Sequence, residues 1–63
     1  MDTVELVKNR WYVQPDDLIG GWCITNIPIP PSQHTKENGA YSIGDFISYE
    51  IAAHIVQIHN ENL

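Results

Sequence analysis

The 63-residue sequence predicts an α+β domain of the order β-β-β-α, in which a three-stranded antiparallel sheet carries one C-terminal helix on one face. Three observations predict it. Two segments in the first half of the chain alternate with a period of two, a third short apolar segment follows an Asn-Gly turn, and the last segment repeats apolar residues at helical spacing. We expect residues 1–63 to form a single domain, because a chain this short has no room for two.

The first strand is predicted over about residues 6–14. Its apolar and aromatic side chains fall into two alternating sets: Val7, Trp11 and Val13 on one face, Leu6 and Tyr12 on the other. Pro15 ends the strand, because proline has no amide hydrogen for the sheet, and the two aspartates that follow it favour a turn.

The second strand is predicted over residues 22–27 and the third over residues 40–46. Both alternating sets of the second strand carry apolar residues, so the pattern leaves open which face is buried. Prolines at the start of the loop 28–39 stop this strand, and Asn38-Gly39 closes the loop with a turn. Gly44 within the third strand indicates a bulge or a close backbone approach.

The helix is predicted over about residues 49–59. Ser48 is placed to cap it, and Ile47 to pack against Ala52 as a hydrophobic staple. At 100° per residue, one stripe collects the apolar residues that we expect to face the sheet: Ile51, Ala52, Ile55, Ile58 and His59. In particular, Ile51, Ile55 and Ile58 should meet the sheet together.

The charge balance bears on the partners of the protein. Eight acidic residues oppose three basic ones, for a net charge of −5, and no Lys or Arg follows Lys36. Binding to phosphate backbones or to anionic membranes needs the opposite balance, so we expect neither nucleic acid nor membrane as a partner. A protein partner, or a second copy of the chain, remains open. The lone thiol of Cys23 fits a reducing compartment, which predicts a cytoplasmic protein.

Few residues offer catalytic or metal-binding chemistry. His54 and His59 are five residues apart and point in different directions on a helix, so no metal site and no cofactor are expected. Cys23 lies in a predicted strand, where a free cysteine is usually a small buried hydrophobe rather than a nucleophile. His59 is expected to be half-buried near the helix C-terminus and bonded to backbone. We therefore predict no enzymatic activity and no small-molecule substrate.

Six aromatic residues are too many for one short helix to cover. Because a sheet has two faces, we expect part of this set to lie on the face away from the helix and to form an interaction surface: Tyr12, Trp22 and Tyr41. The alternative is that the long proline-rich loop folds over that face.

Several short motifs resemble a group of short uncharacterised proteins of actinobacteria and their phages. The resemblance covers about residues 11–60 and lies in four segments: Trp11-Tyr12-Val13 with Pro15-Asp16-Asp17, Gly20-Gly21-Trp22-Cys23, Ala40 to Phe46, and Ser48 with Glu50-Ile51-Ala52-Ala53-His54-Ile55 and His59-Asn60. The chain also resembles small β-β-β-α domains in which a Gly-Trp strand precedes the final helix. The resemblance implies the fold and a phage or bacterial origin, and it implies no activity.

Three functional hypotheses follow. The first is a non-enzymatic protein-interaction module, with self-association through the open sheet face as one form. The second is a small phage or bacterial regulator or inhibitor, of the counter-defence type, that binds a host protein. The third is a structural domain with no dedicated ligand.

Overall fold

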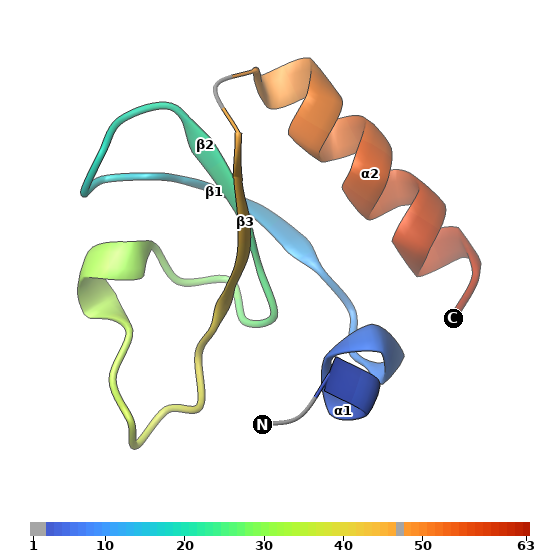
Figure 1. Cartoon of the computed structure of the whole chain (residues 1–63), viewed down its shortest axis with the longest axis horizontal. Coiled ribbons are helices and arrows are strands. Elements are labelled where there is room, and N and C mark those ends of the chain that lie inside the picture. Colours follow the sequence, from blue (N-terminus) through green and yellow to red (C-terminus); the bar gives the residue numbers. More distant parts are fainter. Residues whose placement is uncertain (1–2, 47) are drawn as a thin grey trace.

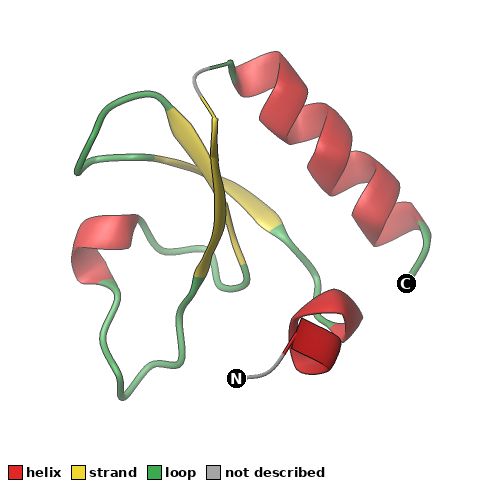
Figure 2. Ribbon diagram, in the orientation of Figure 1, coloured by secondary structure: helices red, strands yellow, loops and turns green. Residues whose placement is uncertain are grey.

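The elements of the structure follow the predicted order. The computed structural model describes residues 3–46 and 48–63. The described residues form α1 (Thr3–Lys8), β1 (Tyr12–Pro15), β2 (Trp22–Thr25), the 3-10 turn η1 (Pro31–Gln33), β3 (Ser42–Phe46) and α2 (Tyr49–Glu61). Figures 1 and 2 show how these helices and strands are arranged. The α+β class and the antiparallel three-stranded sheet followed by a helix are confirmed, and a short N-terminal helix is added.

The sheet has the strand order β1-β2-β3, and both pairs are antiparallel. Val13 lies opposite Ile24, and Ile24 lies opposite Gly44. The pairing of β2 with β3 shifts between Ile24 and Thr25, because Thr25 pairs with Ser42 and Ile43 is the extra residue. The bulge that Gly44 indicated is thus present, one residue before the glycine.

The strand predicted over residues 6–14 is wrong in its first half. Thr3–Lys8 is helical, and β1 begins only at Tyr12. The alternation of Leu6 and Val7 with polar residues is too short to distinguish a strand from a helical turn. The residues of β2 that pair with β1 end at Thr25, which pairs with Tyr12, so the chain before Tyr12 has no partner in this ladder.

Helix α2 packs on one face of the sheet, as Figure 1 shows. The side chain of Ser48 accepts a hydrogen bond from the amide of Ile51, so the predicted cap is confirmed, whereas Ile47 lies outside the described residues. Ala52 and Val56 are buried and form the core with Ile24. Five half-buried residues pack against this core: Trp11, Val13, Trp22, Ile43 and Ile55.

The predicted stripe of α2 is wrong at two of its positions. Ile51 is 55% exposed and Ile58 is 47% exposed, whereas Val56, placed at the margin of the stripe, is buried. The helix is therefore rotated about its axis relative to the expectation. The small side chain of Ala52 explains the rotation, because it lets the helix backbone approach the sheet where an isoleucine would hold it away.

The opposite face of the sheet is covered by the proline-rich loop. Figure 1 shows η1 and its loop on one side of β3 and α2 on the other. Cys23 and Thr25, whose side chains alternate with those of the core-facing Trp22 and Ile24, are fully buried. The alternative expectation, a loop folded over this face, is therefore confirmed. No helix among residues 3–46 and 48–63 has the length and apolar character to cross a membrane.

Candidate interaction surfaces

Trp22 does not lie on the face away from the helix, and that expectation was wrong. It packs against the core beneath α2, and its ring meets the ring of Tyr49 edge to face with the centroids 4.9 Å apart. The register explains the placement, because Trp22 lies two residues from the core residue Ile24 and so shares its face. Both alternating sets of the second strand were apolar, so the sequence pattern could not decide between the faces.

Tyr12 and Tyr41 lie away from the helix, but they form no open sheet face. Tyr12 is half-buried opposite the fully buried Thr25. Tyr41 is 43% exposed, and its backbone amide donates to Oδ1 of Asn26 over 2.6 Å. The three residues predicted as one surface are therefore separated by the sheet, which places Trp22 on one side and Tyr12 on the other. Their role in binding stays a prediction.

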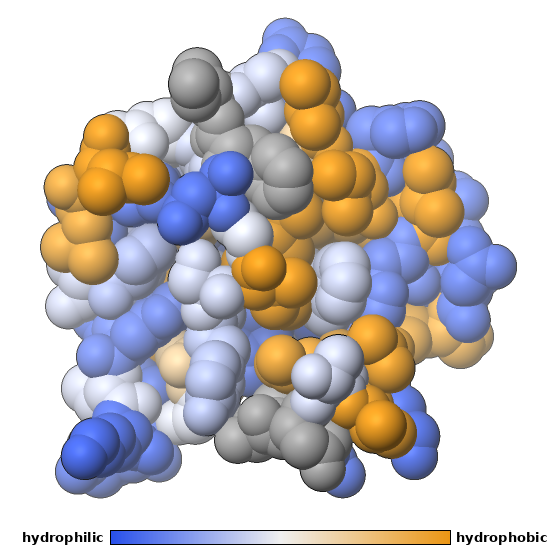
Figure 3. Space-filling view, viewed as in Figure 1, coloured by the Kyte–Doolittle hydropathy of each residue, from blue (hydrophilic) through white to orange (hydrophobic). Residues whose placement is uncertain are grey.

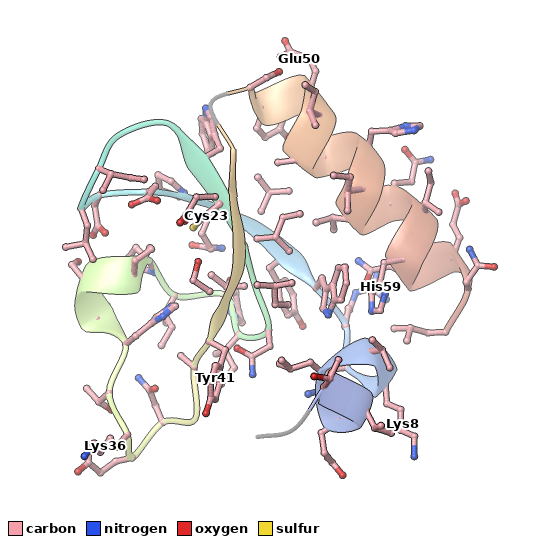
Figure 4. The ribbon with its side chains drawn as sticks, in the orientation of Figure 1. Lys8, Cys23, Lys36, Tyr41, Glu50 and His59 are labelled. Carbon is pink, nitrogen blue, oxygen red and sulfur yellow. The ribbon has the colours of Figure 1, made fainter. Side chains whose placement is uncertain are left out.

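Tyr41 lines a hollow of about 410 Å³ inside the proline-rich loop, together with His34, Thr35, Lys36, Gly39 and Ala40. Figure 4 labels Tyr41 and Lys36 on this loop. The ring of His34 is held by the carbonyl oxygen of Ile29 at 2.9 Å, and Gly39 adopts a positive φ of 68° that allows the loop to turn. Most of the lining is exposed or half-buried loop, so the hollow reflects the path of the loop around its turn.

Cys23 lies on the loop-covered side of the sheet, as Figure 4 shows. It is fully buried, as expected, and its thiol donates to the carbonyl oxygen of Gln14 with 3.5 Å between sulfur and oxygen. Burial, and then the negative charges of Asp16 and Asp45, raise the pKa of the thiol to about 11. The thiol is therefore protonated at neutral pH and a poor nucleophile.

The two carboxylates near Cys23 could not be predicted from the sequence. Three atoms lie within 4.8 Å of one another: a carboxylate oxygen of Asp16, the sulfur of Cys23 and a carboxylate oxygen of Asp45. Asp45 comes from the partner position of Cys23 on β3, so only the register brings the two together. Oδ1 of Asp16 already accepts hydrogen bonds from the amides of Leu18 and Ile19, which gives this carboxylate a structural role in the turn.

His59, near the end of α2, contacts the segment that precedes β1. Its ring stacks on the indole of Trp11 with the centroids 3.5 Å apart and the planes inclined by 7°. Its Nε2 lies 2.7 Å from the carbonyl oxygen of Asn9, to which it donates. The expectation of a half-buried histidine bonded to backbone is confirmed. His54, by contrast, is exposed, so the two histidines of α2 have different surroundings.

Four exposed apolar residues lie on the two helices. We call this set the outer apolar face and define it by its members: Val4 and Val7 of α1, and Ile51 and Ile58 of α2. Figure 3 shows apolar side chains at both helices. Half-buried Ile55 connects the two isoleucines along α2, because residues four and three apart share one helix side.

A second exposed apolar pair lies at the turn between β1 and β2. Leu18 is 66% exposed and Ile19 is 73% exposed, and we call this pair the turn tip. Figure 3 shows apolar side chains at that edge of the molecule, remote from the two helices. Neither the outer apolar face nor the turn tip was predicted, because an apolar side chain in a sequence gives no sign of whether the fold will cover it.

Comparison of the chain with protein-family models, with curated proteins and with solved structures gave no match.

Proposed function

We propose that this protein is a non-enzymatic protein-interaction module that binds a second copy of itself through the outer apolar face. The observation that carries the proposal is the exposure of Ile51 and Ile58 on the only long helix among the described residues, together with the exposure of Val4 and Val7 on α1. Ile51 and Ile58 share one side of α2, and exposed apolar residues gathered on one side of a helix are typical of protein contact surfaces.

The small core supports a partner for this face. The buried apolar residues among those described are Cys23, Ile24, Ala52 and Val56, of which Ala52 and Cys23 are small. A chain of this length buries a modest fraction of its surface, so folding alone leaves it marginally stable. Covering Ile51 and Ile58 with a second copy would add buried apolar area of the kind that the core lacks.

The polar groups with catalytic potential serve the fold instead. The thiol of Cys23 is buried and donates to a backbone carbonyl. The ring of His59 stacks on Trp11 and donates to the carbonyl oxygen of Asn9. These engagements support a binding protein over a catalyst, since a nucleophile needs an accessible, deprotonated atom beside a free base.

The charge of the chain supports a protein partner over a nucleic acid. Eight acidic residues face three basic ones, and α2 carries acidic side chains and no Lys or Arg. Helix α2 therefore offers no Lys or Arg to neutralise phosphates.

Sedimentation velocity tests the proposal with the wild type and the variant Val7→Gln/Ile58→Gln. Glutamine keeps the helix propensity and removes apolar surface at two exposed positions. We expect the wild-type mass and melting temperature to rise between about 10 µM and about 300 µM protein, and the variant to stay a monomer. Gln57→Ala, also exposed on α2 but polar, is the control and should associate as the wild type does.

A wild type that sediments as a monomer over this range, with a melting temperature independent of concentration, would remove self-association. The runner-up hypothesis, a small regulator that binds a host protein, would then take its place.

A further inference from the structure

The far end of the proline-rich loop is held by the side chain of Asn38. Its Oδ1 accepts hydrogen bonds from the amides of Thr35 and Ala40 at 3.2 Å and 3.0 Å. Its Nδ2 donates to the carbonyl oxygen of Gln33 at 3.0 Å. The bond to Ala40, two residues on, folds the carboxamide back along its own backbone. The carboxamide carbon of Asn38 is therefore kept beside the peptide group that joins Asn38 to Gly39.

The amide nitrogen of Gly39 is the atom best placed to react with this carboxamide. Glycine has no Cβ to shield its nitrogen, and the φ of 68° at Gly39 lies in a region that other residues rarely adopt. No atom lies within 4 Å of the position that a Cβ would occupy, so the space beside Gly39 is open. Within the described part of the chain, the Gly39 amide donates to no acceptor, so no hydrogen bond must break before it reacts. Asn38 itself is exposed, so water reaches its carboxamide.

The two amides that bond Oδ1 also favour the reaction electrostatically. When a nucleophile adds to a carboxamide, negative charge develops on the carbonyl oxygen. The amides of Thr35 and Ala40 already donate to that oxygen, so they meet this charge without rearrangement of the loop. The bond from Nδ2 to Gln33 opposes the reaction, because it holds the leaving group, but it is a single bond at an exposed position.

We infer that Asn38 is a site of spontaneous deamidation in the folded protein, the reaction that makes asparagine a thermolabile residue. Hydroxide removes the proton of the Gly39 amide, and the nitrogen adds to the carboxamide carbon of Asn38. The new carbon–nitrogen bond closes a succinimide ring as the bond to Nδ2 breaks. Nδ2 takes a proton from water and leaves as ammonia, which regenerates the hydroxide. Water then opens the ring at either carbonyl and yields aspartate or, with the main chain routed through the side chain, isoaspartate.

The product changes the charge and the bonding of the loop. One new carboxylate takes the net charge from −5 to −6. The carboxylate still accepts from the amides of Thr35 and Ala40, but it has no hydrogen to donate to Gln33, which ends η1. Figure 1 shows this loop on the side of the sheet opposite α2. The modification therefore acts on the loop that covers the second face of the sheet, and it does not involve the outer apolar face.

Incubation of the wild type at mildly alkaline pH, followed by mass spectrometry, tests the inference. Cleavage after Lys36 leaves residues 37–63 as one peptide, which carries Asn38 together with Asn60 and Asn62. Fragmentation of this peptide follows each asparagine in the same sample. Asn62 is the matched control, because it is also exposed and also donates from Nδ2 to a backbone carbonyl, but it precedes a leucine.

We expect aspartate and isoaspartate to form at Asn38 about tenfold faster than at Asn62, because glycine leaves its amide unshielded and leucine does not. The rate at Asn38 should be at least as high in the native protein as in the chain unfolded in urea, because the native loop supplies the two amides at Oδ1. Asn38→Gln moves the carboxamide one methylene further out, and it should give no product at this position over the same time.

Two outcomes would overturn the inference. A rate at Asn38 no higher than that at Asn62 would mean that the Gly39 amide does not react in this protein. A rate at Asn38 that is lower in the native protein than in the unfolded chain would mean that the loop protects this asparagine instead. Either result leaves the proposed self-association untouched, because sedimentation measures it separately.

Discussion

At the scale of the residue, the register of the sheet decides which charged groups lie near the thiol of Cys23. Its thiol is buried between two aspartates, one from the turn after β1 and one from the partner position on β3. Burial and these charges raise its pKa from an ordinary value of 9.0 to about 11. The folded state therefore holds this proton more tightly than the unfolded chain. The resulting contribution to stability is fully present below pH 9.0 and is lost as the pH rises through about 11.

We expect the free energy of unfolding of the wild type to fall more steeply between pH 9 and pH 11 than that of Cys23→Ala. Urea denaturation at a series of pH values measures both. Alanine leaves a small cavity and lowers stability at every pH, so the comparison uses the slopes and not the absolute values. Tyrosines titrate in the same range in both proteins and cancel in the difference. Parallel curves would show that the thiol titrates normally.

At the scale of the element, α2 depends on two neighbouring alanines with different surroundings. Ala52 is fully buried against the sheet, whereas Ala53 is half-buried at the side of the helix. The position of the helix over Ile24 follows from the small size of Ala52, because close-packed interiors leave no room for added methylene groups.

Ala52→Leu should therefore lower the free energy of unfolding by about 1–3 kcal/mol, through overpacking against the sheet. Ala53→Leu makes the same chemical change one residue on, and it should cost less than about 1 kcal/mol because the side chain can extend towards solvent. Chemical denaturation monitored by circular dichroism compares them. Equal effects of the two substitutions would mean that α2 does not sit on the sheet through Ala52.

At the scale of the whole molecule, Asn60 closes the fold by binding a segment 49 residues away. Its Oδ1 accepts from the amide of Trp11 at 2.9 Å, and its Nδ2 donates to the carbonyl oxygen of Trp11 at 3.0 Å. The side-chain amide thus pairs with the backbone as a neighbouring strand would. Together with His59 on the indole ring, it attaches the end of α2 to the chain that enters β1.

Asn60→Asp keeps the acceptor and removes the donor, so a carboxylate faces the carbonyl oxygen of Trp11. We expect a loss of about 1–3 kcal/mol at neutral pH. Part of it should return on acidification, when the protonated carboxyl can donate again. Asn62→Asp is the matched control, because its Nδ2 donates to the carbonyl oxygen of Ile58 at an exposed position and should matter less. Thermal melts of both variants at two pH values measure these losses of stability. An equal loss in both variants would contradict a role for Asn60 in closing the fold.

The sequence by itself determined the order of the three strands and the C-terminal helix, the cap of α2 by Ser48, the bulge near Gly44 and the burial of Cys23. Each of these depends on a local signal: a helical or strand period, a hydrogen-bonding side chain before a helix, or a missing side chain in a strand. Only the tertiary structure decided which sides of the elements are covered. In the folded protein, α2 is rotated so that Ile51 and Ile58 are exposed, and Trp22 lies under the helix. Thr3–Lys8 is helical, and the proline-rich loop covers the second face of the sheet. The physical reason is that coverage depends on partners distant in the chain. A strand with apolar residues on both faces fits either orientation, a short apolar alternation fits a strand or a helical turn, and an apolar stripe wider than the contact leaves its edge in solvent.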